Sequence, residues 1–128
     1  MRKTRQFSLG LALNIFALLS ACEGGVFVSA RVVDSEGAPI AGARIRVSDP
    51  EGARVLEAEA SAEGCVTAIT IAAPGRYDFS VEVTATGFKP LSTKARSIEH
   101  HNFEVVLARD GQAFRSQVSA VATLPCPG

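Results

Sequence analysis

The sequence predicts an all-β fold, a sandwich of about seven short strands forming one domain. From Val26 onward, runs rich in Val, Ile, Thr, Phe and Ala are separated every 8 to 12 residues by Gly, Pro or Asp, as is typical of β-sandwiches. This region shows no helical periodicity of useful length. The strictest alternation of apolar and polar residues covers residues 77–85, which indicates a strand near the centre of a sheet.

The other expected strands follow from the same reasoning. Strands over 26–32 and 43–47 have an apolar residue at every second position, and these apolar residues should face the core. Further apolar runs indicate strands at 54–60, 65–72, 91–96 and 102–108. Turn-forming residues separate the strands at 34–37, 49–52, 63–64, 73–75 and 86–87.

The first 21 residues have the pattern of a cleaved bacterial export signal. A positively charged start, residues 1–5, precedes an apolar run of 13 residues, 7–19, that is interrupted only by Ser8, Gly10 and Asn14. A helix of that length rises roughly 20 Å, whereas the hydrocarbon core of a bilayer is about 30 Å thick. The run therefore predicts a signal peptide rather than a permanent membrane span.

The apolar run ends in Leu19-Ser20-Ala21-Cys22, which resembles the lipobox of bacterial lipoproteins. The resemblance implies that Cys22 carries a diacylglycerol after residues 1–21 are removed, and that the membrane is a partner through this lipid. Residues 22–25 would then form a short tether. Glu23 favours the outer membrane, at its periplasmic face or at the cell surface, over the inner membrane. The alternative is an ordinary secretory signal, cut elsewhere, with Cys22 incidental.

Charge argues against nucleic acid as a partner. Removal of Arg2, Lys3 and Arg5 leaves ten basic residues against 13 acidic ones, a net charge of −3. The remaining arginines are scattered among carboxylates, whereas a nucleic-acid binder needs them clustered.

Two cysteines remain if Cys22 carries lipid, and we expect Cys65 and Cys126 to form a disulfide. An even pair of cysteines in an exported protein favours that use. The alternative is one buried thiol and one thiol in a disordered C-terminal end. Neither cysteine has the spacing of a redox or zinc site.

Three segments resemble those of one known family. Residues 37–43 have the form Gly-x-Pro-Leu-x-Gly-Ala with Ile in place of Leu, residues 74–77 read Pro-Gly-Arg-Tyr, and residues 85–88 read Ala-Thr-Gly-Phe. Together they resemble the carboxypeptidase regulatory-like domain, a seven-stranded, transthyretin-like Greek-key β-sandwich. The resemblance implies a domain over 26–109 and leaves 110–128 as a C-terminal tail. The motif of that family near residues 60–65 is only half present, beside Cys65.

Candidate chemistry is sparse. His100 and His101, flanked by Glu99, are weak candidates for a metal site, but neighbouring residues of a strand point oppositely, and we expect an exposed turn. Transthyretin-like folds include a hydrolase acting on hydroxyisourate, which uses a histidine in its first strand and a C-terminal Tyr-Arg-Gly-Ser. No histidine precedes His100, and the chain ends Leu-Pro-Cys-Pro-Gly. Arg44 and Arg46 are expected to face Glu57 and Glu59 as exposed ion pairs.

The sequence therefore predicts a lipid-anchored cell-envelope sandwich with a non-catalytic binding or structural role and without a cofactor. An envelope protein is the partner that this reading favours. A small-ligand or carbohydrate receptor that uses the loops at one end of the sandwich is the alternative, although Trp is absent and Tyr occurs once. A hydrolase is the least favoured interpretation.

Overall fold

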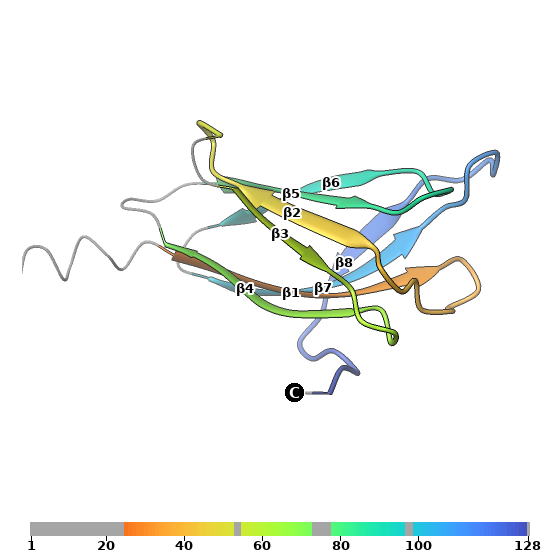
Figure 1. Ribbon diagram of the computed structural model, residues 1–128, viewed down its shortest axis with the longest axis horizontal. Helices are drawn as coiled ribbons and strands as arrows, with labels where there is room; N and C mark the ends of the chain where they lie inside the picture. The colour runs from red at the N-terminus through yellow and green to blue at the C-terminus, as the bar shows by residue number, and fades with distance from the viewer. Residues whose placement is uncertain (1–24, 53–54, 73–77, 97–98, 128) are drawn as a thin grey trace, which may run out of the picture.

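The computed structural model describes residues 25–52, 55–72, 78–96 and 99–127 as two four-stranded sheets packed face to face (Figure 1). The all-β fold class is confirmed. The strands are β1 (Gly25–Asp34), β2 (Arg44–Ser48), β3 (Val55–Glu59), β4 (Cys65–Ala72), β5 (Asp78–Thr84), β6 (Leu91–Arg96), β7 (His100–Leu107) and β8 (Gln117–Ala120). In this part of the chain, no helix is long and apolar enough to span a membrane.

The strand order is β4-β1-β7-β8 in one sheet and β3-β2-β5-β6 in the other. Pairing is antiparallel throughout the second sheet, whereas β1 lies antiparallel to β4 and parallel to β7. The chain changes sheet between β1 and β2, β3 and β4, β4 and β5, and β6 and β7. Residues distant in sequence therefore become neighbours in space.

The core lies between the two sheets and contains the alternating apolar residues. The apolar positions expected to face the core in residues 26–32 and 43–47 are at most 1% exposed: Val26, Val28, Ala30, Val32, Ala43, Ile45 and Val47. In β5, Phe79, Val81 and Val83 are buried to the same degree, and β5 lies between β2 and β6. The prediction of a central strand there is confirmed. Tyr77, expected in this strand, lies outside the described residues.

The C-terminal region adds an eighth strand to the seven expected ones. Residues 110–128 were expected to form a tail, but β8 pairs antiparallel with β7, and the partly buried Val118 packs against the core. Four residues are too few for an alternation that sequence alone can identify. Because β7 is already in the sheet, its free edge supplies the pairing partner.

The two ends of the sandwich differ in what they carry. At the end where β1 begins, hereafter the tether end, β2 ends and β3 and β7 begin (Figure 1). Phe27 and His100, which pair near the starts of β1 and β7, lie at this end, as do the turn 49–52 and Val55. At the opposite end, hereafter the far end, the Lys89 amide donates to the carbonyl of Ala108 across 2.7 Å, which joins loops of the two sheets. The far end consists of loops 35–43, 60–64, 85–90 and 108–116.

Candidate functional site

The outer face of the β3-β2-β5-β6 sheet is polar. Successive side chains of a strand point to opposite faces of the sheet. Because Ile45, Val47 and Phe79 are buried, the residues between the buried ones in β2 and β5 point to solvent. The strand register then sets Arg46 between Glu57 of β3 and Glu82 of β5. The face thus carries rows of charged and hydroxyl side chains over the buried core.

Cross-strand ion pairs occupy part of this face. Arg44 Nη2 lies 3.4 Å from Glu59 Oε1, and Arg46 Nε lies 3.7 Å from Glu57 Oε1. These are the pairs that the sequence predicts. All four side chains are more than half exposed, so each pair contributes less than about 1 kcal/mol to stability. The two arginines are therefore exposed groups of this polar face.

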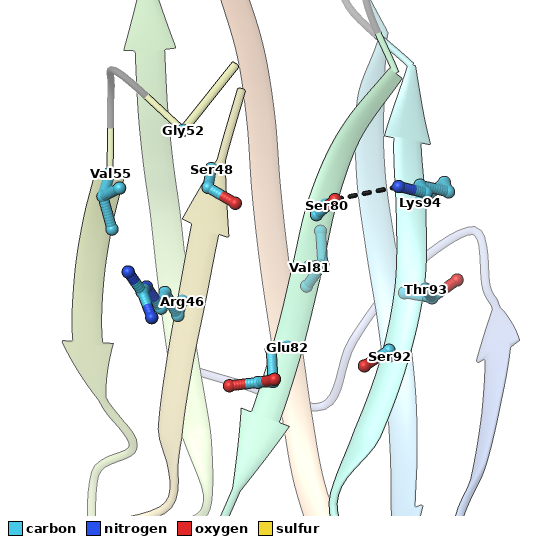
Figure 2. A pocket seen from close by; sticks show the side chains of 10 residues that line it. All are labelled: Arg46, Ser48, Gly52, Val55, Ser80, Val81, Glu82, Ser92, Thr93 and Lys94. Carbon is cyan, nitrogen blue, oxygen red and sulfur yellow. Dashed lines mark hydrogen bonds between the residues drawn. The ribbon is translucent and has the colours of Figure 1, made fainter. Parts of the chain in front are cut away.

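A hollow of about 490 Å³ lies over the same face, nearer the tether end (Figure 2). Ser80 accepts a hydrogen bond of 2.8 Å from the Lys94 ammonium at its rim. Figure 2 shows that the lining residues come from four strands, β2, β3, β5 and β6, and from Gly52 in the β2–β3 turn. The hollow is lined by Arg46, Ser48, Gly52, Val55, Ser80, Val81, Glu82, Ser92, Thr93 and Lys94.

The hollow has the size of a small-molecule site and a polar lining. It offers hydroxyls from Ser48, Ser80 and Ser92 together with the cationic Lys94 and the anionic Glu82. Its lining residues include neither histidine nor cysteine nor an aromatic ring. Such a set can hydrogen-bond a polar ligand. Ser80 is bonded to Lys94, but Lys94 donates to it as an exposed ammonium rather than accepting its proton, so the pair is not arranged as a nucleophile with a base. Sequence analysis missed this hollow because four strands contribute to it, one or a few residues each.

The two histidines point to opposite faces, as expected, but the expected turn is part of β7. Pairing of β7 with β1 extends the strand to His100, which lies opposite Phe27. The ring centroid of His100 is 6.1 Å from that of Phe27, and the ring of His101 stacks on Phe103 at 5.4 Å.

The side chain of His101 is only 16% exposed, so the expectation of an exposed pair is wrong for this residue. Its Nε2 lies 3.0 Å from the Arg96 carbonyl oxygen and 3.7 Å from Glu99 Oε2. Among the described residues, no three His, Cys, Asp or Glu side chains gather as a metal site would require.

Cys65 and Cys126 form a disulfide, with 5.9 Å between their Cα atoms. Cys65 opens β4 at one edge of its sheet, whereas β8, which precedes Cys126, lies at the other edge. The segment after β8 therefore crosses the outer face of this sheet, where the Asn102 side-chain amide donates to the Ala122 carbonyl across 3.0 Å. The bridge thus fastens the C-terminal segment. Cys22 and the signal lie outside the described residues.

The far end holds a cluster that the sequence did not reveal. Asp34 ends β1, and its Oδ1 accepts hydrogen bonds of 2.9 Å from the amides of Glu36 and Ala38. Its Oδ2 lies 3.4 Å from Arg109, whose guanidinium also lies 5.1 Å from the ring centroid of Phe88. Asp34, Arg109 and Phe88 contact one another or neighbouring backbone groups. We therefore interpret the cluster as a structural one that holds the loops in place, not as a ligand site.

The sequence profile of the carboxypeptidase regulatory-like domain matches residues 28–119. The chain belongs to this family. The match extends beyond residue 109 and includes the first three of the four residues of β8, in agreement with the structure. Of the three segments that carried the resemblance, 37–43 forms the β1–β2 turn and 85–88 the β5–β6 turn, whereas 74–77 lies outside the described residues. No curated protein sequence matches the chain.

Solved structures share the fold of this carboxypeptidase regulatory-like domain. The 5-hydroxyisourate hydrolase of Klebsiella pneumoniae is 16% identical with a TM-score of 0.58, over 75% of this chain and 99% of the hydrolase. Hydroxyquinol 1,2-dioxygenase from Pseudomonas putida DLL-E4 is 14% identical with a TM-score of 0.53, over 68% of this chain and 57% of the enzyme.

A third similar structure is chlorocatechol 1,2-dioxygenase from Pseudomonas putida, which is 12% identical with a TM-score of 0.54. That match covers 67% of this chain and 61% of the enzyme. The chain thus spans about three fifths of each dioxygenase. At such low identities the likeness concerns the β-sandwich and carries no activity with it.

Proposed function

We propose that this carboxypeptidase regulatory-like domain is held at the cell envelope by a lipid on Cys22, where it acts by binding rather than by catalysis. The observation that carries the proposal is the Cys65–Cys126 disulfide. It accounts for two of the three cysteines and leaves Cys22, directly after an apolar run, as the one thiol to be explained. A disulfide also suits an exported protein, because oxidising compartments preserve it.

The proposed location is the outer membrane, at its periplasmic face or at the cell surface. Glu23 supports it, because a residue other than Asp directly after the lipidated cysteine favours the outer membrane. An envelope protein is the proposed partner. The polar β3-β2-β5-β6 face is the surface on which we expect it to bind, because hydroxyls and charges there are exposed on a rigid sheet.

A non-catalytic role is favoured by the chemistry of the described residues. The ionisable side chains that line the hollow, Arg46, Glu82 and Lys94, are exposed, whereas catalytic groups usually lie in enclosed pockets that are shielded from water. The first histidine in the sequence is His100, in β7 rather than in the first strand. These observations weigh against a hydrolase of the hydroxyisourate type.

A small polar ligand in the hollow is the second candidate function. The hydroxyl-rich lining and the volume of about 490 Å³ favour it. This candidate differs from the end-loop receptor that the sequence suggested, since the far-end loops are occupied by the Asp34 cluster. A carbohydrate would have to bind there without aromatic stacking, because the lining has no aromatic ring.

Intact-mass measurement tests the anchor. The precursor is expressed in a bacterial host, extracted from membranes and weighed, with Cys22→Ser as the matched control. We expect a mass equal to residues 22–128 plus acyl chains for the wild type and no acyl mass for the variant. A wild-type product without acyl chains would refute the anchor. Thiol alkylation only after reduction would report the Cys65–Cys126 bridge in the same sample.

Ligand titration tests the hollow. Amide resonances of the ¹⁵N-labelled protein are followed while short oligosaccharides and charged peptides are added separately. Binding in the hollow should shift Ser48, Ser80 and Ser92, and Lys94→Ala should weaken it, whereas Lys89→Arg, at the far end, should not. Shifts confined to the far-end loops would instead support the end-loop receptor.

A further inference from the structure

Most charged side chains on the outer face of the β3-β2-β5-β6 sheet are paired with one another. The four strands carry eight charged residues, four basic and four acidic. Six of them form three ion pairs: Arg44 with Glu59 at 3.4 Å, Arg46 with Glu57 at 3.7 Å, and Arg96 with Asp78 at 3.8 Å. The two that remain are Lys94 and Glu82, which have opposite charges, and both line the hollow.

Strand register places these two charges diagonally across β5 and β6. Lys94 lies opposite Ser80, and Glu82 lies opposite Ser92. The Lys94 ammonium donates to the Ser80 hydroxyl across 2.8 Å, whereas the Glu82 side chain has neither a hydrogen bond nor an ion pair with any described residue. Figure 2 shows the Glu82 carboxylate on the β2 side of β5, away from the Lys94 ammonium. The two charges therefore do not neutralise each other by direct contact.

Small side chains form the floor of the hollow between these charges. Ser48 of β2 lies opposite Ser80 of β5, and both residues are half-buried. Longer side chains surround the two serines, with Lys94 on β6 and with Arg46 and Glu82 two positions along β2 and β5. The hollow thus exists because two serines occupy adjacent positions on central strands. Their hydroxyls can each donate or accept a hydrogen bond.

We propose that the hollow binds a small zwitterion of the α-amino acid class, with the ligand carboxylate at the Lys94 ammonium and the ligand ammonium at the Glu82 carboxylate. This inference rests on the second candidate function, the binding of a small polar ligand in the hollow. The hydroxyls of Ser48 and Ser80 hydrogen-bond the ligand between the two charges. The volume of about 490 Å³ leaves room for the side chain of the amino acid.

Charge balance selects this class of ligand. Arg46, the third charged residue of the lining, is already paired with Glu57, so one positive and one negative charge remain. A ligand with only a negative charge is attracted by Lys94 but repelled by Glu82, and a ligand with only a positive charge meets the reverse. A zwitterion is attracted by both. Because Lys94 and Glu82 are exposed, water and salt screen each contact, and the affinity should be weak and should fall as salt is added.

Three matched probes test the charge requirement. The free amino acid alanine carries both charges, N-acetylalanine carries only the carboxylate, and alanine amide carries only the ammonium. Each probe is titrated into the ¹⁵N-labelled full chain, and its dissociation constant is obtained from the amide resonances of the hollow. Maltose serves as a polar probe without charge.

Two variants each remove one of the unpaired charges, Lys94→Met and Glu82→Gln. The matched controls, Arg96→Gln and Glu59→Gln, remove charges of the same sign on the same face but outside the hollow. All four side chains are exposed, so the variants should keep the urea unfolding midpoint of the wild type.

Alanine should bind severalfold more tightly than either analogue. Lys94→Met should weaken alanine and N-acetylalanine severalfold but not alanine amide, whereas Glu82→Gln should weaken alanine and alanine amide but not N-acetylalanine. The two controls should leave all dissociation constants unchanged.

Equal binding of the three alanine probes, or equal loss with the control variants, would overturn the inference. Shifts in the hollow with maltose but not with alanine would also overturn it, while leaving the small-ligand function intact. No shift with any of the four probes would refute that function together with the inference.

Discussion

The guanidinium of Arg109 and the carboxylate of Asp34 lie 3.4 Å apart, although 75 positions separate them in the chain. The Asp34 side chain is only 8% exposed, and Arg109 also lies over the ring of Phe88. The pair therefore joins the ends of β1 and β7 to the β5–β6 turn. A paired carboxylate with little exposure stabilises a fold more than a freely solvated one does.

The first prediction concerns acid stability at this pair. Hydrogen bonding from the Ala38 amide lowers the pKa of Asp34 below its usual value of 3.8; burial opposes this shift, and the Glu36 amide and Arg109 assist it. Because the folded pKa lies below the unfolded one, the stabilisation is present above pH 3.8 and is lost as pH falls through the folded pKa. Asp34→Asn should therefore unfold at lower urea than wild type at pH 7.

Urea unfolding of both proteins at pH 7 and near pH 3 measures this effect. The difference between the urea midpoints of wild type and Asp34→Asn should become smaller at the lower pH. Asp110→Asn, which changes an exposed carboxyl at the same end of the sandwich, is the control and should have little effect. A wild-type midpoint equal to that of Asp34→Asn at pH 7 would contradict the prediction.

The disulfide should contribute a large part of the stability. It links residues 61 positions apart, and the chain-entropy model gives roughly 4 kcal/mol for a loop of that size. We expect the Cys65→Ser/Cys126→Ser variant to be destabilised by about 2–4 kcal/mol in denaturant unfolding. Reduced wild type should match the variant. If reduction left the unfolding midpoint unchanged, the bridge would add nothing to folding.

Gly64 should tolerate no side chain, unlike Gly37. Both have positive φ, +76° and +83°, but a Cβ at Gly64 would lie 2.4 Å from the Val32 carbonyl oxygen, whereas one at Gly37 meets nothing within 4 Å. Gly37→Ala should cost only the backbone strain of a left-handed residue, about 1–2 kcal/mol. Gly64→Ala should lower the free energy of unfolding clearly more. The Val32 amide donates to the Gly64 carbonyl across 2.8 Å, so Val32 cannot move away from the added Cβ without disturbing this hydrogen bond. Equal thermal unfolding of the two variants would disprove the clash.

The ion pair of Arg46 and Glu57 should contribute little. Its atoms lie 3.7 Å apart and both side chains are 54% exposed, so solvent and salt screen the attraction. A double-mutant cycle of Arg46→Ala and Glu57→Ala should give a coupling below about 1 kcal/mol that shrinks further in 1 M salt. A coupling that is larger, or insensitive to salt, would indicate that something covers this face in solution.

Local alternation accounts for how well the strands were predicted. A period of two in residues 26–32 and 43–47 assigns core and solvent faces before any pairing is known, and burial of Val28 and Ile45 confirms it. The turn glycines and Pro39 are equally local signals, since they restrict φ at one residue. Pairing of Cys65 with Cys126 was predictable by counting cysteines, although sequence alone left an alternative open.

Long-range geometry decided the rest. The four residues of β8 form a strand because β7 offers a free edge, and His101 becomes mostly buried because β1 pairs with β7. The hollow and the Asp34–Arg109 contact each bring together residues from strands or loops distant in the chain. Sequence by itself determined the all-β class and the faces of most strands, because side-chain alternation is a property of neighbouring residues. Only the tertiary structure decided which side chains share a surface, because that depends on strand order and register.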